Sequence, residues 1–453
     1  MKICIQGLGY VGATTAVLLA SKLIKKKPKF QVIGLEKKNE TGLDRVKKFK
    51  KYQFPFESND KNIFKSIKVI KKNKNFFPTF DKNCLSNVDI IIVSMGLDLS
   101  KNKKNFNDRQ FINGIIDIGN KISENTLVVI QSTVPIGYTR KIIKPLIFKL
   151  VKKRGIDYNN IYLAHSYERV TPGKNYLNSI SNSHRVYSGI NKTSKKLCKK
   201  FLEEFINYKR YPLTELENTD ASELSKILEN SFRAINIALI EEWRKFSEYI
   251  SVDLEKIISG IKLRDTHKNM MLPGLGVGGY CLTKDPLFAE LSAKKIFNKN
   301  MKFNYSSSAV TTNTEMLNAN IGKVKKIIRD NDTSVKKILL FGLSYKADVD
   351  DLRHSPSLIM AKSLKKDVHD VYFFDNFIKK DFEDIKKLKN LNKINDFDLI
   401  IFAVNHENFK KVNFDKLKIS KKTIIYDANL VLTSEQENIL RIKAKHYFKI
   451  GKN

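Results

Sequence analysis

The sequence predicts an α/β protein with two doubly wound parallel-sheet domains, joined by a long central helix and a helical region. Three observations carry this prediction. A glycine-rich turn follows a short apolar strand at the start of the chain, a helical pattern runs over residues 217–248, and the first strand pattern returns in outline after residue 335. A chain of 453 residues has room for two or three domains. We expect these domains to cover residues 1–205, 206–325 and 326–453.

The first strand, residues 2–6, leads into a G-x-G-x-x-G turn and then a helix, which is the context that a dinucleotide fingerprint requires. Gly7 makes the tight turn, Gly9 lets a pyrophosphate approach the backbone, and Gly12 lets the helix pack closely on the strand. The helix N-terminus then offers free N–H groups to the phosphates. The pattern indicates a Rossmann-like domain, with cofactor contacts from Gly7, Gly9, Tyr10, Val11 and Gly12.

The second strand ends at Glu36, where a carboxylate accepts a hydrogen bond from the adenosine ribose and repels a 2′-phosphate. We therefore expect NAD as the cofactor. Two more buried strands are predicted at residues 88–96 and 126–133. Because ligands bind beyond the carboxyl ends of strands in such sheets, Thr133 lies at the cofactor crevice, unless it is an ordinary strand-end hydroxyl.

The stretch 161–173 predicts a strand that is followed by Glu168-Arg169 and a Pro-Gly turn, and a further short strand at residues 184–190 completes the first domain. Glu168 follows the first of them, at the edge of the sheet where ligands bind. Its carboxylate can act as a base, or it can be a surface group paired with Arg169. The sequence leaves both interpretations open.

The central helix places Glu223, Lys226, Asn230 and Arg233 on one face, because they are spaced three, four and three residues apart. The usual interpretation of such a stripe is a solvated face with ion pairs, and the spacing favours it. The alternative is that Lys226 and Asn230 point together into a site, where an ammonium and an amide one turn apart suit an oxyanion. We expect a helical segment of this length to carry a dimer interface.

Residues 273–286, PGLGVGGYCLTKDP, surround Cys281 with glycines. Glycines allow positive φ and close approach of a ligand. Lys284 follows the cysteine and would favour its thiolate, which is the nucleophilic form. The alternative is a surface loop that happens to hold a buried cysteine.

The last part of the chain repeats the first in outline, with strands at residues 336–348, 371–376, 397–404 and 422–429. It lacks a G-x-G-x-x-G turn and keeps only Gly342, followed by Tyr345, Lys346 and Asp348. We expect a second nucleotide-binding-type domain that holds something other than a dinucleotide pyrophosphate.

Composition limits the remaining functions. The net charge of +36 fits a polyanion partner or a drift of the whole chain toward lysine. The lysines lie in scattered pairs and triplets, which favours the second interpretation and predicts no nucleic-acid and no membrane partner. The four cysteines and seven histidines have no spacing typical of a disulfide framework or a metal site. No signal peptide or membrane span is visible, so we expect a cytoplasmic protein.

Taken together, the motifs resemble those of the UDP-glucose/GDP-mannose dehydrogenase family of nucleotide-sugar 6-dehydrogenases. They stand in the family's order over nearly the whole chain. The matching stretches are GLGYVG (7–12), STVPIG (132–137), YERVTPG (167–173), ASELSKILENSFRAINIA (221–238), PGLGVGGYCLTKDP (273–286) and GLSYKADVDDLRHSPS (342–357).

The resemblance implies an NAD-dependent, four-electron oxidation of a sugar C6 hydroxyl to a carboxylate. Cys281 would attack the intermediate aldehyde, and water would later hydrolyse the thioester. Lys226 and Asn230 would stabilise the oxyanion, and Asp285 would orient water or Lys226. Glu168 would be the base for the attack by water, which Thr133 would hold.

The resemblance also implies the binding contacts. Lys346 would bind the phosphates of the UDP-sugar. Lys284 and Arg353 would reach NAD, Arg353 from its own or the neighbouring subunit. The implied architecture is a homodimer through the central helix. The further contacts to the nucleotide sugar would come from Glu168, Lys226, Asn230, Met270, Met271, Leu272, Pro273, Gly274 and Gly278.

Three positions depart from the family pattern. Ser94-Met95-Gly96 stands where many members have Thr-Pro, Pro172 stands where some have a second glutamate, and Thr283 replaces a proline. Pro172 favours a UDP-N-acetylhexosamine as the substrate, whereas the C-L-x-K-D loop favours UDP-glucose. Two alternatives stay open: a two-electron dehydrogenase of the 3-hydroxyacid or 6-phosphogluconate type, which would not need Cys281, and a basic polyanion-binding protein.

Overall fold

The computed structural model describes residues 1–331, 335–367 and 370–452. The chain divides into two compact units. Unit 1 consists of Met1–Glu229 and Leu287–Phe303, and unit 2 consists of Asn230–Pro286 and Asn304–Asn453. The three-domain division expected from the sequence stays a prediction.

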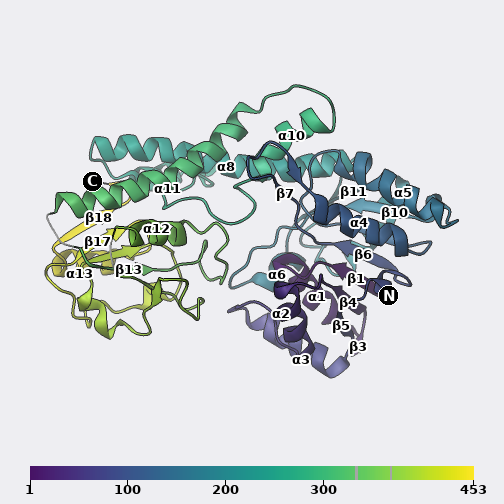
Figure 1. The fold of residues 1–453 in the computed structure, drawn as a ribbon, viewed down its shortest axis with the longest axis horizontal. Helices are drawn as coiled ribbons and strands as arrows, with labels where there is room; N and C mark the ends of the chain where they lie inside the picture. Colours follow the sequence, from purple (N-terminus) through teal and green to yellow (C-terminus); the bar gives the residue numbers. More distant parts are fainter. Residues whose placement is uncertain (332–334, 368–369, 453) are drawn as a thin grey trace. The chain divides into compact units, whose positions relative to one another are not determined.

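Unit 1 is built on an eight-stranded sheet in the order β12-β11-β10-β9-β6-β1-β4-β5 (Figure 1). All neighbouring strands pair in parallel except β10 and β11, which are antiparallel. The sequence predicted the strand at residues 184–190 but gave no sign that it runs in the opposite direction. The strands are β1 (Lys2–Gln6), β4 (Gln31–Leu35), β5 (Phe76–Thr79), β6 (Ile90–Val93), β9 (Leu127–Ile130), β10 (Tyr162–His165), β11 (Arg185–Gly189) and β12 (Leu213–Glu215).

Helices cover both faces of this sheet, as the alternating side chains of β1 show. Ile3 and Ile5 pack into one apolar core, and Cys4 packs into the other. The helices of unit 1 are α1 (Tyr10–Ala20), α2 (Glu40–Lys50), α3 (Lys61–Asn73), α4 (Arg109–Lys121), α5 (Lys144–Lys153), α6 (Tyr176–Ser181), α7 (Lys192–Glu203) and α10 (Phe288–Lys295).

Helix α3 illustrates why these segments are helical. Ile63, Ile67 and Ile70 recur at helical spacing and are all buried, which stabilises the unit by about 2 kcal/mol per side chain. Asp60 caps the helix by accepting a hydrogen bond of 2.9 Å from the backbone N–H of Asn62.

Unit 2 is built on a six-stranded, wholly parallel sheet in the order β15-β14-β13-β16-β17-β18. The order β14-β13-β16-β17 reproduces β4-β1-β6-β9 of unit 1, so the predicted repeat of the nucleotide-binding fold is confirmed. The strands are β13 (Lys337–Phe341), β14 (Asp370–Phe374), β15 (Lys386–Lys387), β16 (Leu399–Phe402), β17 (Ile424–Asp427) and β18 (His446–Lys449), and the helices are α9 (Leu254–Ile261), α11 (Asn304–Asp330), α12 (Pro356–Lys365) and α13 (Ser434–Lys443).

The predicted central helix is α8 (Thr219–Tyr249), drawn in teal in Figure 1. Asn218 starts it by accepting a hydrogen bond of 3.0 Å from the N–H of Ala221. The helix continues past the boundary between the units, which falls after Glu229. Lys226 and Asn230 are therefore assigned to different units.

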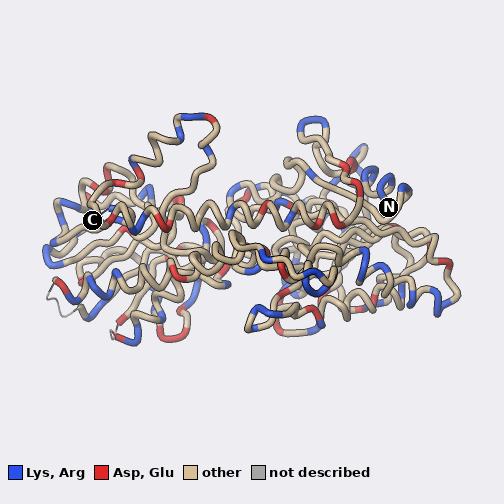
Figure 2. Tube along the Cα trace, turned by 90° about the horizontal axis from the view of Figure 1, so that it is seen from above, with Lys and Arg blue, Asp and Glu red and all other residues tan. Residues whose placement is uncertain are grey.

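Lysines and arginines are spread along the chain in both units (Figure 2). Among the described residues, no helix is long and apolar enough to cross a bilayer. The same residues contain no group of three or more His, Cys, Asp or Glu side chains that could hold a metal ion.

Candidate active site

The glycine turn of unit 1 has the geometry of a phosphate cradle. Gly7 has a φ of +94°, and a Cβ there would lie 2.8 Å from the carbonyl oxygen of Ser94. A Cβ at Gly12 would lie only 1.9 Å from the carbonyl oxygen of Gly7, so helix and turn touch. No atom lies within 4 Å of a Cβ built on Gly9. The backbone at Gly9 is thus open to a ligand at the N-terminus of α1, which fits a dinucleotide pyrophosphate.

Glu36 lies directly behind this turn and is buried. Its carboxylate accepts hydrogen bonds from the N–H groups of Leu8 at 3.0 Å and Lys37 at 2.9 Å. Arg45, which sequence reasoning missed, reaches the same carboxylate at 3.1 Å. The arrangement holds the carboxylate at the end of β4, where it can accept from a ribose hydroxyl.

The carboxyl ends of β1, β4, β6 and β9 meet at one edge of the parallel sheet. Thr133 follows the last of these strands and is half-buried. Ser94 follows β6, and its N–H donates to the carbonyl of Gln6 at 2.9 Å. The segment that departs from the family pattern therefore closes the glycine turn from one side.

Lys226 and Glu168 come together in unit 1. The Lys226 ammonium donates to the backbone carbonyl of Glu168 at 3.2 Å and lies 5.1 Å from the centre of the Tyr167 ring. Lys226 is only 8% exposed. The interpretation of its helix face as solvated is therefore wrong for Glu223, Lys226 and Asn230, which are buried, whereas Arg233 on the same face is exposed.

The alternative pairing of Glu168 with Arg169 is also wrong. Arg169 pairs with Glu229 on α8, with Nη2 and Oε2 3.0 Å apart, and the carboxylate of Glu168 accepts from the N–H of Val170. Arg185 is fully buried and donates to the carbonyl of Tyr167 at 2.7 Å. This hydrogen bond fixes the residue before Glu168. Nothing in the sequence pattern indicated that Arg185 would make it.

Glu223, one turn before Lys226, is fully buried. Its carboxylate accepts from the N–H groups of Gly137 at 2.6 Å and Thr139 at 2.8 Å. Burial raises the pKa of this carboxyl to about 8, although the hydrogen bonds from residues 137 and 139 oppose the shift. Glu223 therefore ties α8 to the loop after Thr133.

In unit 2 the glycines around Cys281 lie in close contact with other segments of that unit. A Cβ at Gly278 would lie 2.7 Å from the carbonyl oxygen of His354, and one at Gly274 would lie 2.7 Å from Asn429 Oδ1. Gly279 has a φ of +80° and packs on the ring of Tyr345. The glycines let the loop pack on the chain itself, and Cys281 is left exposed.

Asp285 is the centre of a buried polar group behind this cysteine. It accepts from Asn230 Nδ2 at 2.7 Å and from Lys284 Nζ at 2.6 Å. The N–H groups of Lys284 and Asp285 both donate to the carbonyl of Cys281, at 3.1 and 2.9 Å. Lys284 is thus paired with Asp285, whereas the sequence suggested a role beside the thiolate.

Lys346 and Arg353 lie on the stretch after β13. Burial and the neighbouring Arg233 lower the pKa of Lys346. Arg233, which the sequence placed only on a helix face, is thus close to the predicted phosphate ligand. Arg353 forms a bidentate pair with Asp351, with distances of 2.9 and 2.6 Å.

Residues 270–274 form the start of the cysteine loop. Met270 and Met271 pack against a small apolar cluster, Leu272 is 40% exposed, and the N–H of Met271 donates to Asn236 Oδ1 at 3.0 Å. The structure therefore brings the predicted residues into two groups, one in each unit.

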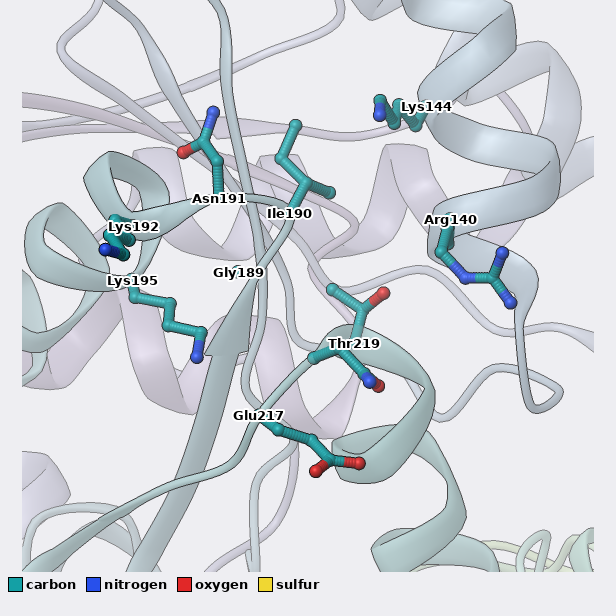
Figure 3. A pocket seen from close by; sticks show the side chains of 10 residues that line it. Arg140, Lys144, Gly189, Ile190, Asn191, Lys192, Lys195, Glu217 and Thr219 are labelled. Carbon is teal, nitrogen blue, oxygen red and sulfur yellow. The ribbon is translucent and has the colours of Figure 1, made fainter.

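A separate cavity of about 250 Å³ in unit 1 contains none of these residues (Figure 3). Four cations line it, but Arg140 is paired with Asp220 at 2.6 Å and Lys195 with Glu215 at 3.4 Å. With half of its positive charge already compensated, the cavity offers little to an anion. Its lining residues are Arg140, Lys144, Gly189, Ile190, Asn191, Lys192, Lys195, Glu217, Asn218 and Thr219.

The fold and the glycine turn define an NAD-dependent dehydrogenase with a second nucleotide-binding-type sheet. Three family models match successive parts of the chain: the NAD binding domain over residues 1–206, the central domain over 220–315 and the UDP binding domain over 339–434. The chain belongs to the UDP-glucose/GDP-mannose dehydrogenase family. It is an NAD-dependent UDP-sugar 6-dehydrogenase. The three matches favour this function over the two alternatives left open by the sequence.

Relatives of known name cover almost the whole chain. A UDP-N-acetyl-D-mannosamine dehydrogenase of Methanocaldococcus jannaschii is 30% identical over 444 residues, covering 96% of this chain and 93% of the relative. An NDP-N-acetyl-D-galactosaminuronic acid dehydrogenase of Ralstonia nicotianae is 26% identical, covering 92% and 93%.

The structure of UDP-D-ManNAc dehydrogenase from Pyrococcus horikoshii matches with a TM-score of 0.80 at 24% identity, covering 100% of this chain and 99% of that one. This similarity supports the fold.

Proposed function

We propose that this protein oxidises the C6 hydroxyl of a UDP-N-acetylhexosamine to a carboxylate, with UDP-N-acetylmannosamine as the first candidate. The relatives that cover nearly the whole chain are named for N-acetylated sugars. Pro172, in the position where other members carry a second glutamate, points the same way. UDP-glucose is the second candidate, because the C-L-x-K-D loop leans toward it.

The observation that carries the four-electron chemistry is an exposed cysteine whose own backbone carbonyl is fixed by the polar group around Asp285. NAD accepts one hydride in each of the two oxidations. Between them, the Cys281 sulfur adds to the aldehyde carbon and the carbonyl oxygen takes a proton, which gives a thiohemiacetal. Loss of a hydride from carbon and a proton from oxygen leaves a thioester. Water then adds, the C–S bond breaks and the thiolate departs.

Lys226 and Asn230 stabilise the oxyanion that forms when sulfur or water adds to the carbonyl. The contact of Lys226 with the Glu168 carbonyl and of Asn230 with Asp285 supports this assignment, because each side chain is buried and held by a hydrogen bond. Glu168 is the base for the attacking water, and Thr133 holds that water.

For binding, we assign Lys346 to the substrate phosphates, with the backbone of residues 270–274 and Gly278 along the nucleotide sugar. We also assign Lys284 and Arg353 to the binding of NAD, Arg353 from its own or the neighbouring subunit. The lowered pKa of Lys346 beside Arg233 supports a phosphate site, because two cations that face each other favour a dianion between them.

We further propose a cytoplasmic homodimer that forms through α8. The basis is an apolar face that α8 leaves exposed within unit 2. Its members are Phe232, Leu239, Trp243 and Phe246, and the exposed Ile250 follows directly after the helix.

The test of the function is the amount of NADH formed per UDP-sugar consumed. Purified protein with excess NAD would receive limiting UDP-N-acetylmannosamine, UDP-N-acetylglucosamine, UDP-N-acetylgalactosamine or UDP-glucose in separate reactions. We expect two NADH per UDP-N-acetylmannosamine and a uronic acid as the product. One NADH per sugar would contradict the thioester route, and turnover of UDP-glucose alone would contradict the proposed sugar.

A further inference from the structure

His406 lies after β16 in unit 2 and is fully buried. Its ring stacks on Phe377, with centroids 5.1 Å apart and an interplanar angle of 18°, and meets the edge of Phe409 at 5.0 Å. A polar ring in such an apolar wall needs hydrogen-bond partners. It finds two: Nδ1 accepts from the N–H of Asp348 at 2.9 Å, and Nε2 lies 3.2 Å from Asp375 Oδ2.

These two contacts hold the segment 343–348 at both ends. Asp375 Oδ2 also accepts from the N–H of Leu343 at 2.8 Å. Between the ends, the hydroxyl of Ser344 donates to the carbonyl of Lys346 at 2.8 Å and lies 3.4 Å from His406 Nε2. The imidazole thus contacts the segment directly at Ser344 and Asp348, and it reaches Leu343 through Asp375.

The segment needs such support because of its backbone. Asp348 has a φ of +60°, which is unfavourable for a residue with a Cβ and persists only where the surroundings hold it. Its N–H is held by His406, and its Oδ1 accepts from the N–H of Glu407 at 3.2 Å. Both contacts come from the stretch 405–407.

The matching turn of unit 1 does not need this support. There, β1 ends at Gln6 and α1 begins at Tyr10, so a helix follows the turn at once. In unit 2, β13 ends at Phe341 and α12 begins only at Pro356. Both turns donate an N–H to the acid of the next strand, but only the longer one has a buried histidine behind it.

We propose that His406 is a positioning residue for the UDP-sugar: it fixes segment 343–348 so that Lys346 is held ready for the substrate phosphates. The proposal rests on the proposed function in one respect, the assignment of Lys346 to those phosphates. Loss of the imidazole removes the acceptor of the Asp348 N–H and one of the partners of the Asp375 carboxylate, so the segment relaxes and the ammonium of Lys346 moves with it.

The test compares His406→Phe, His406→Asn and wild type in UDP binding by calorimetry and in steady-state kinetics. Phe keeps the stacking but has no acceptor, whereas the Asn oxygen can replace Nδ1 as acceptor for the N–H of Asp348. We expect His406→Phe to raise the UDP dissociation constant and the UDP-sugar KM by about tenfold, the effect of about 1.4 kcal/mol. His406→Asn should recover part of this loss, and the KM for NAD should stay unchanged. The matched control is His446→Phe, since His446 is exposed on β18.

Equal UDP affinity of His406→Phe and wild type would overturn the proposal, as would a parallel rise of the KM for NAD. If His406→Phe does not fold, His406→Gln replaces it, because Gln can donate toward Asp375 but offers no acceptor at the position of Nδ1. A wild type that binds no UDP would refute the proposed substrate and this role together. A wild type that binds UDP beside variants that bind it equally well would refute the role of His406 alone.

Discussion

Asn230 Nδ2 donates a hydrogen bond of 2.7 Å to Asp285 Oδ2, and both side chains are buried. The contact joins α8 to the loop that carries Cys281. The second oxygen of Asp285 accepts from Lys284 Nζ at 2.6 Å, so one carboxylate orients an amide and compensates an ammonium.

Asp285→Asn should therefore impair both activity and stability. The variant leaves the buried Lys284 without its counter-charge, which costs about 3 kcal/mol of unfolding free energy. It also lets the Asn230 amide turn, and misplacement of such a group lowers kcat by about a hundredfold. Urea unfolding and initial rates measure the two effects. Asp384→Asn, at an exposed position, is the control and should match wild type. An Asp285→Asn protein of full activity would remove Asp285 from the site.

Cys281→Ser should separate the two oxidations. A hydroxyl is far less ionised than a thiol at neutral pH, so kcat for uronic acid formation should fall by roughly a thousandfold. The NADH formed per sugar should fall from two to at most one, because the first hydride transfer does not need the sulfur. Product analysis by mass spectrometry checks this result. Cys84→Ser, at a half-buried thiol of unit 1, is the control. Two NADH per sugar from Cys281→Ser would show that the second oxidation does not need a sulfur adduct, which would remove Cys281 from its assigned role.

Glu36→Ser should change the choice of cofactor. The carboxylate that repels a 2′-phosphate is lost, and Arg45, now 3.1 Å from that carboxylate, becomes available to bind the phosphate. We expect the ratio of kcat/KM for NAD over NADP to fall by at least about tenfold. Glu40→Ser, an exposed change at the start of α2, should leave the ratio unchanged. An unaltered ratio in Glu36→Ser would mean that another group selects NAD.

The sequence predicted most of the fold because the evidence for it is local. A glycine turn between a strand and a helix, and its echo after residue 335, are visible without any tertiary contact. The direction of β11 was missed because it depends on a long-range pairing, of Ala164 with Gly189. The same limit applies to the site: spacing put Lys226 and Asn230 on one helix face, but could not tell that the face is buried.

The residues that sequence reasoning missed share one property. Arg45, Arg185, Arg233 and His406 each contact or influence a group of another segment, and each is an ordinary polar residue in its own segment. Only the packing of the sheets brings them to Glu36, Tyr167, Lys346 and Asp348. A motif shows which residues carry the chemistry, whereas the fold shows which residues hold them.

Glu223 should make stability depend on pH. Its pKa is raised to about 8 in the folded protein by burial, from an ordinary value near 4 in the unfolded chain. Below the unfolded pKa, Glu223 is protonated in both the folded and the unfolded state, and its full contribution to the free energy of unfolding is present. As the pH rises toward 8, the unfolded state releases the proton first, so the free energy of unfolding falls by about 1.4 kcal/mol per unit of pKa difference at most. Above pH 8 the loss stops growing.

Glu223→Gln resembles the protonated side chain and should remove this pH dependence. The variant should exceed wild type in urea unfolding, by a clearly larger margin at pH 8.5 than at pH 5. Glu242→Gln, an exposed change on the same helix, should follow wild type at both values. A Glu223→Gln protein that is less stable than wild type at pH 8.5 would show that the ionised carboxylate is the form that the N–H groups of Gly137 and Thr139 require.

The exposed apolar face of α8 gives a direct test of the dimer. Trp243 is the only tryptophan of the chain and is 55% exposed on this face, next to Phe246 at 53%. Burial in a homodimer should shift its emission to shorter wavelength as protein concentration rises. Phe246→Asp places a charge in the interface and should raise the dimer dissociation constant by about a hundredfold, as measured by sedimentation and fluorescence. Phe64→Asp changes an equally exposed phenylalanine of unit 1 and should have no effect. Trp243 emission that is independent of concentration, in a protein that sediments as a monomer, would rule out this face as the interface.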